Sequence, residues 1–97
     1  MLAKNEILAL LAKSKPELQA RFGVTHLSLF GSYARNEAKA TSDIDVLIAF
    51  DGPATSSRYF GVLFYLEDLF GCTIDLVTEK ALRQELRPFI ESEMLYV

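Results

Sequence analysis

Two short stretches near the middle of the 97-residue chain carry the residue types that bind phosphates and divalent cations. The first is the small-residue turn Gly31-Ser32, and the second is Asp43-Ile44-Asp45. Glycine has no Cβ, so its backbone can approach a phosphate closely, and the serine hydroxyl is a further donor. Paired carboxylates supply the hard oxygen ligands that magnesium takes. Together the two stretches indicate a site at which a phosphate group meets a cation.

The carboxylates are expected to share one face of the sheet. The spacing of Asp43 and Asp45 sends both side chains to the same side of the strand that they enter. Their charges repel each other, which is tolerated if water solvates them or a cation lies between them. Asp75 stands between Ile74 and Leu76 in a strand that we expect to be buried, where an unpaired charge is costly. If the strands of Asp45 and Asp75 are neighbours, three carboxylates converge, which suits two magnesium ions flanking a phosphoryl group.

The turn at Gly31-Ser32 belongs to neither of the common glycine-rich nucleotide motifs. The sequence contains no G-x-x-x-x-G-K-[ST] and no G-x-G-x-x-G. If residues 33–35 begin a helical turn, the amide of Ser32 faces outward at its positive end, where an anion binds. Arg35 either reaches a phosphate or forms an ion pair with Glu37.

Hydrophobic periodicity and turn signals predict one α/β domain over residues 1–97, without an internal repeat or a linker. We expect helices over residues 2–12, 18–22, 33–35, 56–70, 79–86 and 88–94, and strands over residues 25–30, 44–50 and 73–77. A capping box from Ser14 to Glu17 separates the first two helices, and Ser56 or Ser57 caps the long central one. Alternate positions of the second strand form its apolar face, opposite the carboxylates: Ile44, Val46 and Ile48.

The composition is that of an ordinary globular protein and excludes several classes of function. Apolar residues make up 51% of the chain and charged residues 24%, with a net charge of −3. No cluster of lysine and arginine stands out, so we expect no stable binding to nucleic acid. No apolar run approaches the length of a membrane span, and the N-terminus lacks a signal-peptide pattern. We therefore expect a cytoplasmic protein that does not bind membranes.

The spacing of the two stretches resembles a known signature. Gly31-Ser32, ten further residues and then Asp43-Ile44-Asp45 match the pattern G-S-x10-D-x-D of the polymerase-β-like nucleotidyltransferase superfamily. The surrounding residues resemble its minimal nucleotidyltransferase branch, and the resemblance covers nearly the whole chain, including Asp75 in the third strand. Asn36 departs from the pattern, because the branch commonly has glycine there. Asparagine tolerates the left-handed backbone conformation, so we expect the turn to be preserved.

The resemblance implies a fold, a reaction and roles for these residues. The fold would be a small mixed β-sheet flanked by helices. Asp43 and Asp45 would bind magnesium ions, and Asp75 would join one of them and help to deprotonate the attacking hydroxyl. Gly31 and Ser32 would hold the terminal phosphates of a nucleoside triphosphate. The enzyme would transfer a nucleoside monophosphate and release pyrophosphate.

Members of this branch are often encoded beside a protein with a HEPN domain, in a pair that resembles a toxin–antitoxin module. The resemblance therefore implies an antitoxin that transfers AMP from ATP to a tyrosine of a HEPN ribonuclease toxin. A protein acceptor fits the acidic charge balance of the chain. The alternative is a non-catalytic antitoxin that blocks its partner by contact. Transfer to a small molecule is disfavoured, because no acceptor-binding domain is recognisable.

Two further sets of residues have open interpretations. Three basic residues recur at helical spacing and form either a solvated face or a surface for a triphosphate or an acidic partner: Lys80, Arg83 and Arg87. We expect four aromatic side chains to lie in the core or at a protein interface rather than to stack on a nucleotide base: Tyr59, Phe60, Phe64 and Tyr65. The high apolar content of so small a chain favours some exposed apolar surface, and hence a protein partner.

Overall fold

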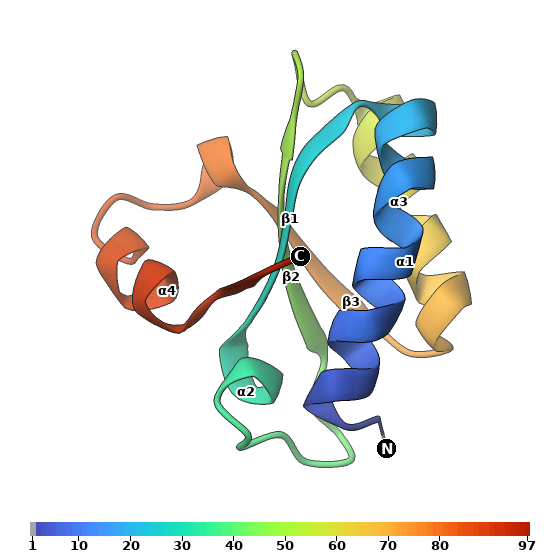
Figure 1. Ribbon diagram of the computed structural model, residues 1–97. Coiled ribbons are helices and arrows are strands. Elements are labelled where there is room, and N and C mark those ends of the chain that lie inside the picture. The colour runs from blue at the N-terminus through green and yellow to red at the C-terminus, as the bar shows by residue number, and fades with distance from the viewer. Residues whose placement is uncertain (1) are drawn as a thin grey trace.

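A four-stranded sheet separates two groups of helices in the computed structural model, which describes residues 2–97 (Figure 1). In chain order the elements are α1 (Lys4–Phe22), β1 (Val24–Phe30), α2 (Gly31–Ala34), β2 (Ile44–Phe50), α3 (Ser56–Phe70), β3 (Ile74–Thr78), the 3-10 turn η1 (Glu79–Ala81), α4 (Arg87–Glu93) and β4 (Leu95–Tyr96). Figure 1 shows α1 and α3 on one face of the sheet and α4 on the other. The predicted α/β class is therefore confirmed.

The sheet is mixed, with the strand order β3-β2-β1-β4. β1 pairs antiparallel with β2 and with β4, whereas β2 and β3 are parallel. Parallel neighbours need a long crossover, and α3 supplies it by running from the end of β2 back to the start of β3. As a result, the N-terminal ends of β2 and β3 lie beside the C-terminal end of β1.

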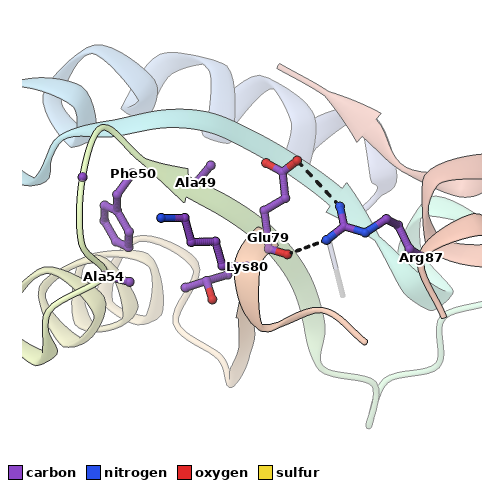
Figure 2. A pocket seen from close by; sticks show the side chains of 8 residues that line it. Ala49, Phe50, Ala54, Glu79, Lys80 and Arg87 are labelled. Carbon is purple, nitrogen blue, oxygen red and sulfur yellow. Dashed lines mark hydrogen bonds and ion pairs between the residues drawn. The ribbon is translucent and has the colours of Figure 1, made fainter. Parts of the chain in front are cut away.

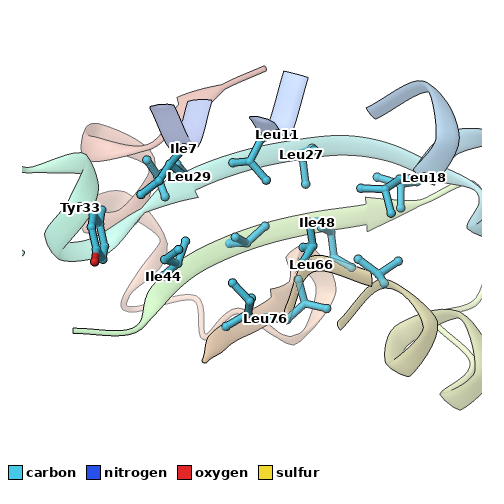
Figure 3. Close-up of a cluster of buried hydrophobic side chains, with 14 residues drawn as sticks. Ile7, Leu11, Leu18, Leu27, Leu29, Tyr33, Ile44, Ile48, Leu66 and Leu76 are labelled. Carbon is cyan, nitrogen blue, oxygen red and sulfur yellow. The ribbon is translucent and has the colours of Figure 1, made fainter. Parts of the chain in front are cut away.

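The core lies between the sheet and the helices α1 and α3 (Figure 3). Ile44, Val46 and Ile48 are fully buried in it, as the predicted alternation along β2 requires. Helices α1 and α3 contribute a stripe of aliphatic side chains to the same layer: Ile7, Leu11, Leu18, Val62 and Leu66. Asp45 lies on the opposite face of β2, so the packed core supports the strand without burying its carboxylate completely.

The capping box expected between the first two helices is wrong, because α1 continues through Pro16 to Phe22. Ser14 does not cap a new helix; its hydroxyl is buried and donates to the backbone oxygen of Leu11 at 2.9 Å. A proline inside a helix costs about 3 kcal/mol. Burial of Leu11 before the proline and Leu18 after it holds the helix together across this position. The predicted stop at Gly23 is confirmed, with a left-handed φ of 75°.

The helix expected over residues 79–86 is also wrong. Thr78 does cap at this point, with its Oγ1 accepting from the amide of Ala81 at 3.3 Å, but only the short turn η1 follows. No residue of η1 is buried, and residues 83–86 are exposed, so no packing sustains a longer helix. Two smaller differences occur: Thr55, not Ser56 or Ser57, caps α3, and the short strand β4 was not predicted.

No helix in the described part of the chain, residues 2–97, is long and apolar enough to cross a membrane.

Candidate active site

Asp45 and Asp75 lie side by side near the N-terminal ends of β2 and β3, next to the C-terminal end of β1. They are direct partners in the parallel register of the two strands, which places both carboxylates on one face. The expectation that their strands are neighbours is therefore confirmed. We expected Asp75 to be buried, but the structure shows it exposed. The reason is that β3 is the outermost strand of the sheet. Ile74 and Leu76 on either side of it are buried as predicted.

Asp43 lies one residue before β2 begins, in an exposed stretch without regular structure. The alternation of a strand therefore does not fix the direction of its side chain. Within residues 2–97, no group of three histidine, cysteine, aspartate or glutamate side chains lies close enough together to hold a metal ion. The site thus consists of the pair Asp45 and Asp75 with the charge of Asp43 nearby, rather than a preformed set of three ligands.

The carboxylate of Asp45 has a strongly perturbed affinity for protons. Partial burial raises its pKa, a hydrogen bond with Asp75 and the negative charges of Asp75 and Asp43 raise it further, and the pKa reaches about 7. The positive charge of Arg35 acts in the opposite direction. A pair of carboxylates that retains a proton near neutral pH is electrostatically suited to a divalent cation, which would replace that proton. The donor set therefore fits magnesium.

Gly31 brings the small-residue turn directly against Asp45. Its φ of 75° is left-handed, and a Cβ at this position would overlap the Asp45 carboxylate. The helical turn α2 begins at Gly31, two residues earlier than expected, and Ser32 is half-buried at its start. Tyr33 anchors the turn in the hydrophobic core. Asn36 has the left-handed φ of 59° that we expected of it.

A glutamate of α4 also forms hydrogen bonds with the turn. Arg35 donates from Nε to Glu37 at 3.0 Å, which confirms that pair, and from Nη1 to Glu93 at 2.9 Å. The same Glu93 carboxylate accepts the amide hydrogen of Gly31 at 3.1 Å. The two carboxylates raise the pKa of Arg35, Glu93 more than Glu37. Sequence reasoning missed Glu93, because 62 residues separate it from Gly31 and no local pattern marks it.

A cavity of about 300 Å³ lies near the far ends of β2 and β3 and is distinct from the carboxylate pair (Figure 2). It is lined by Ala49, Phe50, Gly52, Ala54, Thr78, Glu79, Lys80 and Arg87. The side chain of Arg87 is engaged here, since its Nη2 donates to the backbone oxygen of Glu79 at 3.0 Å (Figure 2). Because residues 79–86 form no helix, Lys80, Arg83 and Arg87 do not make the helical basic face that their spacing predicted.

The family of the chain follows from comparison with known proteins. A family model described as a nucleotidyltransferase domain matches residues 11–97. The chain belongs to this family. The match begins inside α1 and contains every element that positions Gly31, Asp45 and Asp75. The chain is therefore a nucleotidyltransferase of the minimal type that the sequence signature indicates.

Individual relatives agree with this assignment. The chain is 38% identical over 97 residues to the protein adenylyltransferase MntA of Thermococcus cleftensis and covers 98% of that protein. A solved minimal nucleotidyltransferase superimposes with a TM-score of 0.82 at 32% identity, covering 97% of this chain and 95% of the other. The fold also matches a structure of a tri-AMPylated HEPN toxin in complex with an MNT antitoxin from Shewanella oneidensis, with a TM-score of 0.60, 19% identity, and coverage of 96% and 66% of the two chains.

Proposed function

We propose that this nucleotidyltransferase uses magnesium and ATP to transfer AMP to a tyrosine of a cognate HEPN ribonuclease toxin, and so acts as an antitoxin in the cytoplasm. The observation that carries the proposal is the contact of Gly31 with the carboxylate of Asp45, beside Asp75. It brings a turn suited to phosphates against a pair of carboxylates suited to a cation. We treat residues 1–97 as one minimal nucleotidyltransferase domain.

Each candidate residue has a role in this reaction. Gly31 and Ser32 hold the terminal phosphates of ATP at the start of α2, and Asp43 and Asp45 hold magnesium. Asp75, which is exposed and adjacent to Asp45, joins the metal ligands and accepts the proton of the attacking tyrosine hydroxyl. Bound magnesium would neutralise negative charge on the phosphates. The hydroxyl oxygen forms a bond to the α-phosphorus while the bond to pyrophosphate breaks, so the chain's task is positioning and charge neutralisation.

A protein acceptor is supported by three observations. The relative from Thermococcus cleftensis is a protein adenylyltransferase, and the complex from Shewanella oneidensis contains an AMPylated HEPN toxin. In addition, this chain exposes large aromatic side chains of the kind found at protein interfaces. The rings of Phe60 and Phe64, both on α3, stack on each other with centroids 5.9 Å apart. Phe89 on α4 is 72% exposed.

The test uses the chain together with the proposed HEPN partner. After incubation with ATP and magnesium, the intact mass of the HEPN protein should increase by one or more AMP groups, and peptide sequencing should place them on tyrosine. A variant with both Asp43→Asn and Asp45→Asn should add none. An unchanged mass of the partner, or AMP addition that persists in the double variant, would contradict the proposal.

A second candidate function is neutralisation of the HEPN partner by contact alone. The observation in its favour is that the described carboxylates do not form a preformed set of three metal ligands. This function predicts that the variant Asp43→Asn with Asp45→Asn still inhibits the ribonuclease at stoichiometric amounts. The adenylylation mechanism predicts that inhibition by a catalytic amount of the chain is lost in this variant, although the variant still folds and binds the partner.

A further inference from the structure

Glu93, the last residue of α4, joins the C-terminal part of the chain to the turn at Gly31. Its Oε1 accepts the amide hydrogen of Gly31 at 3.1 Å, and its Oε2 accepts from Nη1 of Arg35 at 2.9 Å. The side chain is only 21% exposed. One carboxylate thus uses both oxygens on two partners within the turn, and hydrogen bonds to an ionised acceptor are among the stronger ones in proteins.

Glu93 approaches the turn from the side of β1 on which β4 lies, opposite to β2. β4 pairs with β1 through Ser28 with Tyr96 and Leu29 with Leu95, and just beyond these pairs the hydrogen bond from Gly31 joins it to Glu93. The strand order puts β4 on one side of β1 and β2, with Asp45, on the other. Glu93 therefore holds Gly31 on the β4 side of the strand, whereas Asp45 contacts it on the β2 side.

The position of Glu93 is fixed by the segment that follows it. The amide of Val97 donates to the backbone oxygen of Leu27 at 3.0 Å, and Nζ of Lys15 on α1 donates to the oxygen of Val97 at 2.7 Å. These bonds attach residues 95–97 to β1 and α1. Since only Met94 lies between Glu93 and this attached segment, the carboxylate of Glu93 is held beside Gly31.

We propose that Glu93 is a positioning residue for nucleotide binding, which holds the backbone of Gly31 and the guanidinium of Arg35 in the arrangement that ATP and magnesium meet. The inference rests on the proposed function, because it assigns the turn to the phosphates of ATP. Gly31 must keep its left-handed backbone against Asp45, and Glu93 supplies the hydrogen bond that fixes the preceding peptide group. Without it, both the turn and Arg35 gain conformational freedom that nucleotide binding must remove.

The test is the dissociation constant of ATP in the presence of magnesium, measured by calorimetry without any partner protein. Glu93→Ala removes both contacts and should weaken binding about tenfold, the usual effect of losing a charged hydrogen bond. Glu93→Gln keeps an oxygen for the Gly31 amide and should weaken binding by a smaller factor of about three. In both variants the Gly31 amide should exchange with solvent faster, and the increase should be larger for Glu93→Ala.

Two matched variants separate positioning from general stability. Glu91→Gln lies on the same helix and faces Arg87 at 3.6 Å, so it should bind ATP like the unchanged chain. Val62→Ala removes a buried side chain of α3 that does not contact Glu93, and it should lower the melting temperature without changing the dissociation constant. If the unchanged chain binds ATP and Glu93→Ala binds it equally well or more tightly, the positioning role is wrong. If the unchanged chain itself does not bind ATP with magnesium, the proposed function fails and the inference fails with it.

Discussion

Asp45 and Asp75 are direct partners on two adjacent parallel strands, and partial burial together with the hydrogen bond and charge of Asp75 raises the pKa of Asp45 to about 7. Such an arrangement is unfavourable without a compensating charge, because the sheet places two carboxylates of like charge on one face. A divalent cation held by these carboxylates would supply that charge and replace the proton.

The stability of the metal-free protein should fall as the pH rises from 5.5 to 8.5. The pKa of Asp45 is raised from 3.8 to about 7, so in this range the folded state binds more protons than the unfolded state. The stabilisation is complete below the unfolded pKa and is lost as the pH passes the folded value. Urea denaturation with EDTA should show the decrease, and Asp45→Asn should reduce its slope. Asp68→Asn, at an exposed position on α3, is the control; an equal slope in all three proteins would contradict the prediction.

Magnesium should stabilise the protein more at pH 8.5 than at pH 5.5. At the lower pH the cation must displace the proton held by Asp45, whereas at the higher pH the pair is already ionised. The change in melting temperature on adding magnesium measures this effect. We expect no such change in the variant with both Asp43→Asn and Asp45→Asn. An equal gain in that variant would mean that magnesium acts elsewhere on the protein.

Gly31→Ala should abolish nucleotide binding, whereas Gly71→Ala should leave it unchanged. Both glycines have a left-handed backbone, with φ values of 75° and 66°, so each substitution costs about 1 kcal/mol in backbone strain. Only at Gly31 does the new Cβ overlap the Asp45 carboxylate; at Gly71 nothing lies within 4 Å. Calorimetry with ATP and magnesium, together with urea denaturation, separates the two effects. Normal ATP binding by Gly31→Ala would disprove the close contact.

Gly61→Ala should destabilise the protein even though alanine is the better helix former. Gly61 lies inside α3, and a Cβ there would overlap the ring of Phe22 at the end of α1. We expect a loss of about 1 kcal/mol from overpacking. In a chain that already carries Phe22→Ala, the same substitution should be neutral or stabilising by about 0.5 kcal/mol, because only the helix propensity remains. A double-mutant cycle without coupling between the two positions would show that they do not pack together.

The positions of Gly31, Asp45 and Asp75 at the sheet follow from local sequence patterns, whereas the bounds of two helices do not. Gly31, Asp45 and Asp75 lie at the ends of short apolar strands, and local alternation with a glycine turn is sufficient to find such positions. The continuation of α1 through Pro16 depends on the burial of Leu18 against the sheet, which no local signal carries.

The absence of a local signal for long-range packing also explains the wrong helix over residues 79–86 and the missed strand β4. Residues 79–86 have helical spacing of their basic side chains, but they are exposed and lack the packing that would stabilise a helix. Glu93 contacts Gly31 only because β4 pairs with β1 at the end of the chain. Contacts of this kind join residues far apart in sequence, so a single sequence read by local patterns does not reveal them.

The central claim is that the site formed by Gly31, Asp45 and Asp75 transfers a nucleotide and not a phosphate. The most direct measurement incubates the chain and the proposed HEPN partner with magnesium and ATP, labelled in parallel reactions at the α- or the γ-phosphate. We predict that the α-label becomes attached to the partner, that the γ-label is released as pyrophosphate, and that Asp43→Asn with Asp45→Asn transfers neither. Attachment of the γ-label, or transfer of the α-label by the double variant, would contradict the claim.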